Sequence, residues 1–102
     1  MSHHQLFIAG QWREPRSKRY REIINPADES LLALAPEANT EDVEAAIDAA
    51  RHAFDHGPWP QLPPSERSAV LLHIAAAIET EAAHLARLET LNTGKTLGES
   101  EA

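Results

Sequence analysis

The chain has 102 residues, of which 42% are hydrophobic and 25% charged, and this composition is typical of a small globular domain with one core. Its formal net charge of -7 argues against binding to nucleic acid or anionic lipid, since both require clustered positive charge. The chain contains no cysteine, which excludes disulfides, cysteine-bound metals and a thiolate nucleophile within these residues.

The first residues, Met1 to Gln5, lack the basic region and apolar run of a signal peptide. No stretch approaches the roughly 18 consecutive apolar residues that a membrane helix needs. The sequence therefore predicts a soluble cytoplasmic protein, and His3 and His4 are expected to lie in a flexible terminus.

The first third of the chain favours short strands. Residues 6–12 combine an apolar run, a glycine and a tryptophan, and predict a hairpin. Residues 20–24 are rich in β-favouring side chains and stop at Asn25–Pro26, followed by a turn. Residues 31–35 suit either a strand or one helical turn, and their short length before Pro36 favours the strand.

A basic stretch lies between the predicted hairpin and the next strand. Because Glu14 and Glu22 flank it and no aromatic array accompanies it, a solvated loop is favoured over a phosphate-binding patch. Its basic residues are Arg13, Arg16, Lys18, Arg19 and Arg21.

A helix is expected to begin at Asn39 or Thr40, since either side chain can cap it and acidic residues follow in the first turn. Apolar residues recur at steps of three and four along it, and Gly57–Pro58 ends it. This apolar stripe consists of Val43, Ala46, Ile47, Ala50 and Phe54.

The proline-rich segment 59–64 cannot continue a helix, and Trp59 is expected to lie across the neighbouring helices. Ser65 is the predicted cap of the next helix. The helical period then continues to the stop signal at 92–94, either as one helix or with a second start near Thr80, and the sequence does not choose between these two. The apolar positions are Leu71, Ile74, Ala75, Ile78, Ala82, Leu85, Leu88 and Leu91.

The last residues predict the start of another helix, because Thr96 and Glu99 fit a capping box. Helices shorter than about 12 residues are marginal in isolation. We therefore expect that the chain was cut within an element.

Two motifs suggest ligand binding, and each has a simpler interpretation. Gly94–Lys95–Thr96 matches the end of a phosphate-binding loop, but Glu89 stands where that loop needs a glycine, and a helix precedes it instead of a strand. His52 and His56 have the spacing of two metal ligands on a helix face, but no third ligand is suitably spaced. Dipole and surface roles are favoured for this pair.

No other side chains indicate catalysis. The carboxylates lie next to helix caps or on polar faces, the serines lack the setting of a nucleophile elbow, and His73 and His84 fall on polar sectors of their helices. By its site chemistry alone, the chain is expected to be a binding or structural piece.

Seven segments nevertheless have an order and spacing that together resemble those of one enzyme family. They are Leu6–Trp12, Ile23–Pro26, Asp42–Phe54, Trp59, Glu66–Arg67, Leu71–Ala75 and Leu88–Leu97. They resemble the aldehyde dehydrogenase superfamily, and the resemblance covers the chain from about residue 5. Within that family, residues 53–59 and 93–100 look most like betaine aldehyde dehydrogenases.

The resemblance implies oxidation of an aldehyde to a carboxylic acid, with a hydride passing to NAD or NADP and a cysteine forming the covalent intermediate. The family's nucleophilic cysteine, general-base glutamate, oxyanion-hole asparagine and cofactor-binding glycines and lysine would all lie downstream. No catalytic or cofactor-binding residue is therefore expected here, and this segment alone is expected to bind no cofactor and to be inactive. A main-chain carbonyl near Ile24 resembles one ligand of a monovalent-cation site, whose other ligands would lie beyond Ala102.

The implied fold is α/β, with residues 1–102 forming an incomplete amino-terminal segment of the cofactor-binding domain and no separate second domain. Amphipathic helices need a sheet to cover, and the predicted strands are too few to make one. The chain is expected to be a fragment or a truncated reading frame of the enzyme. Its expected partner is the rest of the enzyme or, alternatively, further copies of the chain in a homo-oligomer. The alternative function is a non-enzymatic helical module that self-associates or binds a partner.

Overall fold

The structure is a computed structural model that describes residues 2–102. These residues form two compact units. The first comprises the residues up to Ile23 together with Ala33–Gln61, and the second comprises Ile24–Leu32 together with Leu62–Ala102.

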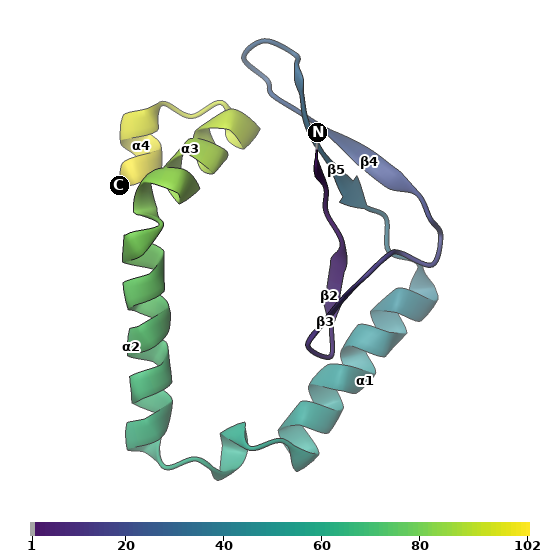
Figure 1. Cartoon of the computed structure of the whole chain (residues 1–102), viewed down its shortest axis with the longest axis vertical. Helices are drawn as coiled ribbons and strands as arrows, with labels where there is room; N and C mark the ends of the chain where they lie inside the picture. The colour runs from purple at the N-terminus through teal and green to yellow at the C-terminus, as the bar shows by residue number, and fades with distance from the viewer. Residues whose placement is uncertain (1) are drawn as a thin grey trace. The chain divides into compact units, whose positions relative to one another are not determined.

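The first unit contains most of the strand residues and one long helix (Figure 1). A sheet of three strands has the order β1-β5-β4, and β2 and β3 form a separate antiparallel pair. The strands are β1 (Ser2–His3), β2 (Leu6–Ile8), β3 (Gln11–Arg13), β4 (Tyr20–Ile24) and β5 (Leu31–Pro36). The hairpin and the strands near residues 20–24 and 31–35 are thereby confirmed.

The hairpin turn consists of Ala9 and Gly10, whose φ angles are 54° and 77°. Positive φ at both central residues is the geometry of a type I′ turn, which matches the twist of two antiparallel strands. Phe7 pairs with Trp12 across the hairpin, and their rings lie 4.7 Å apart. The turn thus sets a register that brings two aromatic side chains together.

The beginning of the chain differs from the flexible terminus expected for His3 and His4. Strand β1 pairs in parallel with β5, with His3 opposite Leu34, and the His4 N–H donates to the Leu34 carbonyl at 3.0 Å. The His3 ring lies 5.0 Å from the Tyr20 ring. Two residues are too few to show a periodic pattern, so only the pairing with β5 reveals this strand.

Helix α1 (Thr40–His56) follows the strands and confirms the predicted bounds. Asn39 is its cap: the Asn39 side chain accepts from the Asp42 N–H, and the Asp42 side chain accepts from the Asn39 N–H. This reciprocal box satisfies backbone donors that the first helical turn leaves unpaired. A 3-10 turn, η1 (Trp59–Gln61), packs against α1 and leaves Trp59 43% exposed.

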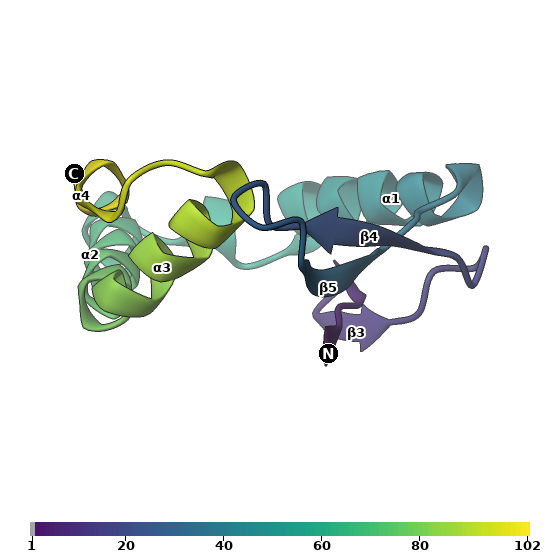
Figure 2. The ribbon, with the colours of Figure 1, turned by 90° about the horizontal axis from the view of Figure 1, so that it is seen from above.

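The second unit contains three helices: α2 (Pro64–Thr80), α3 (Ala82–Thr93) and α4 (Leu97–Glu101). The chain reverses after α3, so α4 lies against α3 (Figure 2). The prediction that Ser65 caps α2 is wrong, because the helix already begins at Pro64 and has no side-chain cap. Proline suits the first helical position, where its missing N–H would have no helical partner.

The break near residue 80 is present, and one continuous helix is excluded. Helices α2 and α3 meet at Glu81 with a bend of 70°. Thr80 is not the cap of α3, because its hydroxyl donates back to the Ala76 carbonyl at 3.0 Å. Glu81 occupies the cap position without a side-chain hydrogen bond.

Helix α2 lacks the single apolar face that the helical period predicted. Successive residues of an α-helix point about 100° apart, so Val70, Leu71 and Leu72 face three different directions. They are 39%, 59% and 70% exposed, respectively. A helix that is apolar all round is typical of an interior position.

No single helix among residues 2–102 is long and apolar enough to cross a membrane. The bent pair of α2 and α3 is long and apolar enough only when the two helices are counted together.

Candidate functional site

Ile24, whose main-chain carbonyl was the predicted cation ligand, is the last residue of β4 and is followed by a loop. Strand β4 lies at one edge of its sheet, and an edge strand directs alternate carbonyls away from its neighbour. The side chain of Ile24 is 40% exposed and that of Asn25 only 8%. Ile24 thus lies where an edge strand enters an exposed turn whose first residue, Asn25, is buried, and its role as a cation ligand stays a prediction.

Asn25 organises this turn through hydrogen bonds in both directions. Its N–H donates to the Ser30 carbonyl at 2.9 Å, and its carbonyl accepts from the Glu29 N–H at 2.8 Å. Its side-chain oxygen accepts from the Ala27 N–H at 2.9 Å. A buried amide with its oxygen paired in this way holds the backbone after Ile24 in one conformation.

The acidic residue of the loop is also engaged locally. The Ser30 hydroxyl and the Ser30 N–H both donate to Oδ1 of Asp28, at 2.6 Å and 3.0 Å, and these bonds lower the pKa of the Asp28 carboxyl. Asp28 therefore favours its ionised form and shapes the turn.

The loop packs against the end of helix α3. Gly94 terminates α3 in the left-handed conformation, with φ 81°, and its N–H donates to the Thr90 carbonyl. A Cβ atom at Gly94 would lie 3.1 Å from Cγ of Pro26. This glycine therefore meets two demands, the positive φ of the helix end and the close approach of the loop.

Gly94–Lys95–Thr96 forms a helix-to-helix connection in the structure. Lys95 Nζ pairs with Glu89 Oε1 at 3.1 Å, and Thr96 Oγ1 accepts from the Glu99 N–H at 3.3 Å as the cap of α4. The predicted start of a helix at Thr96 is confirmed. The lysine is engaged by a carboxylate, and the geometry is that of a helix end followed by a helix cap.

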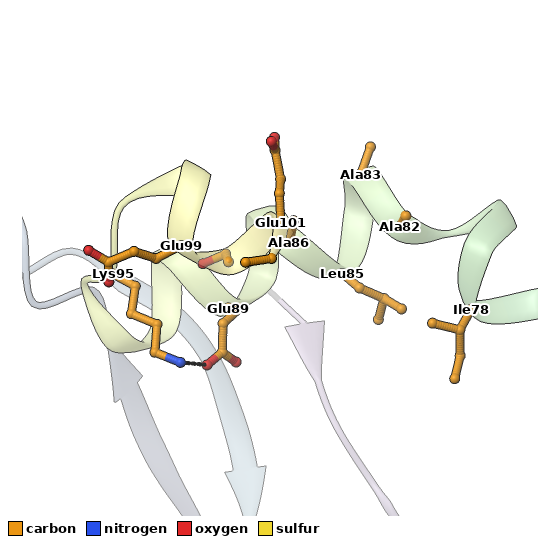
Figure 3. Close-up of a pocket in the computed structure, with 11 residues that line it drawn as sticks. Ile78, Ala82, Ala83, Leu85, Ala86, Glu89, Lys95, Glu99 and Glu101 are labelled. Carbon is orange, nitrogen blue, oxygen red and sulfur yellow. Dashed lines mark hydrogen bonds and ion pairs between the residues drawn. The ribbon is translucent and has the colours of Figure 1, made fainter. Parts of the chain in front are cut away.

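A cavity of about 680 Å³ lies beside this connection (Figure 3). One wall is apolar and comes from α2 and α3, and the other carries the Lys95–Glu89 pair and the residues of α4. The lining residues are Ile78, Ala82, Ala83, Leu85, Ala86, Glu89, Lys95, Glu99, Ser100, Glu101 and Ala102. Its one lysine is paired with Glu89, and no cysteine or histidine is among these lining residues.

The basic stretch is anchored to the amino end of α1. The Arg16 N–H donates to Asp42 Oδ2 at 3.1 Å, and the Arg16 side chain pairs with Glu41 at 3.0 Å and with Asp42 Oδ1 at 3.6 Å. Asp42 is only 1% exposed, and Pro15, which lies within the stretch, is fully buried. Arg16, Lys18 and Arg19 thus lie in the expected loop with exposed side chains, and the loop has an intramolecular anchor. Arg13 and Arg21 belong instead to β3 and β4.

An apolar groove of about 390 Å³ lies between β2 and α1. It exposes much of the stripe predicted on α1, with Val43 49% and Ile47 61% exposed. The groove is lined by Leu6, Phe7, Ile8, Ala38, Asp42, Val43, Ala46, Ile47 and Ala50. Another apolar surface can pack against this lining.

The two histidines of α1 lie near its carboxyl end, with ring centroids 5.1 Å apart. Among residues 2–102, no group of three or more histidine, cysteine, aspartate or glutamate side chains is arranged to hold a metal ion. The pair therefore comes together as its spacing predicts, without a third protein ligand.

Comparisons with known proteins place this geometry in a family. The sequence profile described as the aldehyde dehydrogenase family matches residues 12–102. The chain belongs to the aldehyde dehydrogenase family. The resemblance noted in the sequence is thereby confirmed.

Relatives in the aldehyde dehydrogenase family are similar in sequence to this chain over nearly its whole length. The betaine aldehyde dehydrogenase of Bacillus subtilis is 45% identical over 97 residues, which are 95% of this chain and 20% of the relative. The phenylacetaldehyde dehydrogenase of Pseudomonas fluorescens is 40% identical over 94 residues, which are 92% of this chain and 19% of the relative. The chain thus spans about 20% of the length of the curated relatives it matches.

Among solved structures, the betaine aldehyde dehydrogenase of Staphylococcus aureus in complex with NAD+ matches with a TM-score of 0.93 and 43% identity. The match covers 96% of this chain and 20% of that one. The α/β fold is therefore confirmed as the amino-terminal part of an aldehyde dehydrogenase fold.

The described residues do not themselves form a dinucleotide site. The four glycines lie apart, in the β2–β3 turn, at the ends of α1 and α3, and within α4, so no glycine-rich loop stands between a strand and a helix. Sequence reasoning missed the Pro26–Gly94 contact and the burial of Asp42, because nothing in the local pattern of either residue shows its distant neighbour.

Proposed function

We propose that this chain is the amino-terminal portion of an NAD(P)-dependent aldehyde dehydrogenase that oxidises an aldehyde to a carboxylic acid. The observation that carries the proposal is the combination of a TM-score of 0.93 and 43% identity over nearly all of the chain with only 20% coverage of the enzyme matched. In this proposal, residues 1–102 are an incomplete part of the cofactor-binding domain, and the chemistry is supplied by residues outside them.

The exposed apolar faces support the same proposal. Side chains on the α1 stripe and around α2 remain uncovered, and large apolar areas on a protein surface mark a contact with another surface. The rest of the enzyme provides that cover in the proposed arrangement. A homo-oligomer of the short chain is the alternative, and it corresponds to a non-enzymatic interaction module.

Betaine aldehyde is the proposed substrate, because betaine aldehyde dehydrogenases are similar to the chain both in sequence and in structure. The betaine aldehyde dehydrogenase is 45% identical to the chain and the phenylacetaldehyde dehydrogenase 40%, a difference of only 5 percentage points. Identity in this segment therefore gives little discrimination between aldehydes, and the substrate must be assigned by assay.

The test begins with the intact mass of the natural protein in a cell extract. A mass several times 11.2 kDa supports the proposal, and that protein is then assayed for NAD+ and NADP+ reduction with betaine aldehyde and phenylacetaldehyde. Reduction with either aldehyde supports the enzyme, and preference for betaine aldehyde supports the substrate. A natural mass of 11.2 kDa, or a longer protein inactive with a broad panel of aldehydes, overturns the proposal.

The Ile24 carbonyl is proposed as one ligand of a monovalent-cation site in that enzyme. Main-chain oxygen is a ligand type suited to hard cations, and the hydrogen bonds of Asn25 hold the backbone that follows. Thermal stability of the enzyme is expected to be higher in K+ or Na+ than in a bulky organic cation at equal ionic strength. Equal melting temperatures in all these salts would count against the site.

A further inference from the structure

His52 and His56 form an exposed pair on helix α1 that the proposed enzyme function does not use. They are one helical turn apart, their ring centroids are 5.1 Å apart, and the ring planes are inclined by 51°. Both side chains are exposed. The rings are therefore accessible to a solute from the solvent side.

The ring separation suits two imidazoles that share one metal ion. With Zn–N bonds of about 2.0–2.1 Å, two imidazoles on one Zn²⁺ ion place their ring centroids roughly 4.5–5.5 Å apart. The observed separation lies within this range. Water would complete the coordination, since the described residues provide no third ligand.

The electrostatics around the pair also favour a cation. His56 is the last residue of α1, and the carboxyl end of a helix carries partial negative charge. Asp48 lies one turn before His52, so Asp48, His52 and His56 share one face of the helix. The nearby cation of Arg51 is paired with Asp55 at 2.9 Å, which offsets its repulsion of a metal ion.

We propose that His52 and His56 chelate a divalent cation of borderline hardness, with Zn²⁺ as the representative ion, at the carboxyl end of α1. Imidazole is a preferred ligand of such ions. The spacing alone favoured surface roles, because it offers only two ligands, and the ring separation is the observation that supports chelation. The bound ion would tie the last turn of the helix to the turn before it.

The test is calorimetric titration of Zn²⁺ into the natural protein purified at its full length, carrying His3→Ala and His4→Ala, since those residues offer a competing site. One Zn²⁺ per chain is expected to bind. His52→Ala and His56→Ala are each expected to weaken binding by at least about tenfold, because loss of even an outer-shell partner costs 10–100-fold in metal sites. His73→Ala is the matched control, with an exposed histidine on α2, and should leave the affinity unchanged.

Hydrogen exchange supplies a second readout that does not depend on heats of binding. The Gly57 N–H donates to the Ala53 carbonyl at 2.9 Å, and Zn²⁺ is expected to slow its exchange only when both histidines are present. Circular dichroism first establishes that each variant keeps its helix content. Zn²⁺ binding that is unchanged in His52→Ala and in His56→Ala, or that falls equally in His73→Ala, overturns the proposal.

Discussion

Asp42 is almost completely buried and takes part in several hydrogen bonds. Its backbone N–H donates to Asn39, and its carboxylate accepts from the N–H groups of Asn39 and Arg16, 3 and 26 positions away. A buried carboxylate is tolerated only when it is paired and hydrogen-bonded. Its Oδ1 has no hydrogen bond among the described residues and lies 3.6 Å from Nε of Arg16, which supplies the opposite charge.

Replacing Asp42 with alanine is therefore expected to destabilise the first unit. Asp42→Ala leaves the Arg16 and Asn39 N–H groups without their acceptor and removes half of the capping box, at a cost of about 2–3 kcal/mol in unfolding free energy. Urea denaturation followed by circular dichroism measures this loss.

The neighbouring carboxylate supplies the control. Glu41 also pairs with Arg16, but its side chain is 67% exposed, so Glu41→Ala is expected to cost less than about 1 kcal/mol. Equal losses for the two variants would show that Asp42 acts as an ordinary surface charge.

The ends of the helices are determined by local capping residues and, at α3, also by packing against a distant loop. The start of α1 and the start of α4 are both encoded by side chains within three residues of the cap. The end of α3 is encoded by Gly94, and the structure adds the contact with Pro26 from a loop far away in the sequence. One residue thus serves both the helix and the packing of the second unit.

Gly94→Ala is expected to lower the unfolding free energy of the second unit by about 1–2 kcal/mol, because alanine is disfavoured in the left-handed conformation. The close approach of Pro26 adds to this cost. Thermal unfolding followed at a helix wavelength measures the effect.

Gly98 provides the matched control, since a Cβ atom added there meets nothing within 4 Å and the residue lies inside α4. Gly98→Ala is expected to be neutral or to stabilise by up to about 1 kcal/mol, because glycine is a poor helix former. A Gly94→Ala variant as stable as Gly98→Ala would mean that neither the φ angle nor the contact constrains the junction.

At the scale of the whole molecule, the described residues bury few apolar side chains. Among residues 2–102, Ile8 and Ala86 are the buried hydrophobic residues, whereas fifteen large hydrophobic side chains are between 39% and 70% exposed. Burial of apolar area is the main favourable term in folding, at about 25 cal/mol per Å². The segment therefore has apolar surface available for a further partner.

The 102-residue chain on its own is expected to self-associate and to bind a hydrophobic dye. Sedimentation velocity at several concentrations, together with dye fluorescence, tests this expectation. Leu72→Gln should reduce both signals, because Leu72 is 70% exposed on α2. His73→Gln, at the next position, should leave them unchanged. A monomeric chain that binds no dye would contradict the expectation.

Much of the local structure was predictable from the sequence alone. The hairpin, the strands near residues 20–24 and 31–35, the bounds of α1 and the start of α4 depend on contacts within a few residues, such as periodic apolar positions, caps, glycine and proline. The family resemblance was also readable from the order of short segments. Arg16, Lys18 and Arg19 of the basic stretch lie in the predicted loop, whereas Arg13 and Arg21 belong to β3 and β4. The anchor of the loop was not foreseen.

Only the tertiary structure decided which distant residues meet. Strand β1 exists through pairing with β5, Asp42 is buried against a loop 26 positions away, and Gly94 faces Pro26. The choice between one helix and two at Glu81 was also decided by the structure, whereas the start of α2 at Pro64 follows a local preference of proline that the sequence prediction did not apply. The physical reason is that propensity and capping act over three or four residues, whereas these features depend on the path of the chain between residues far apart.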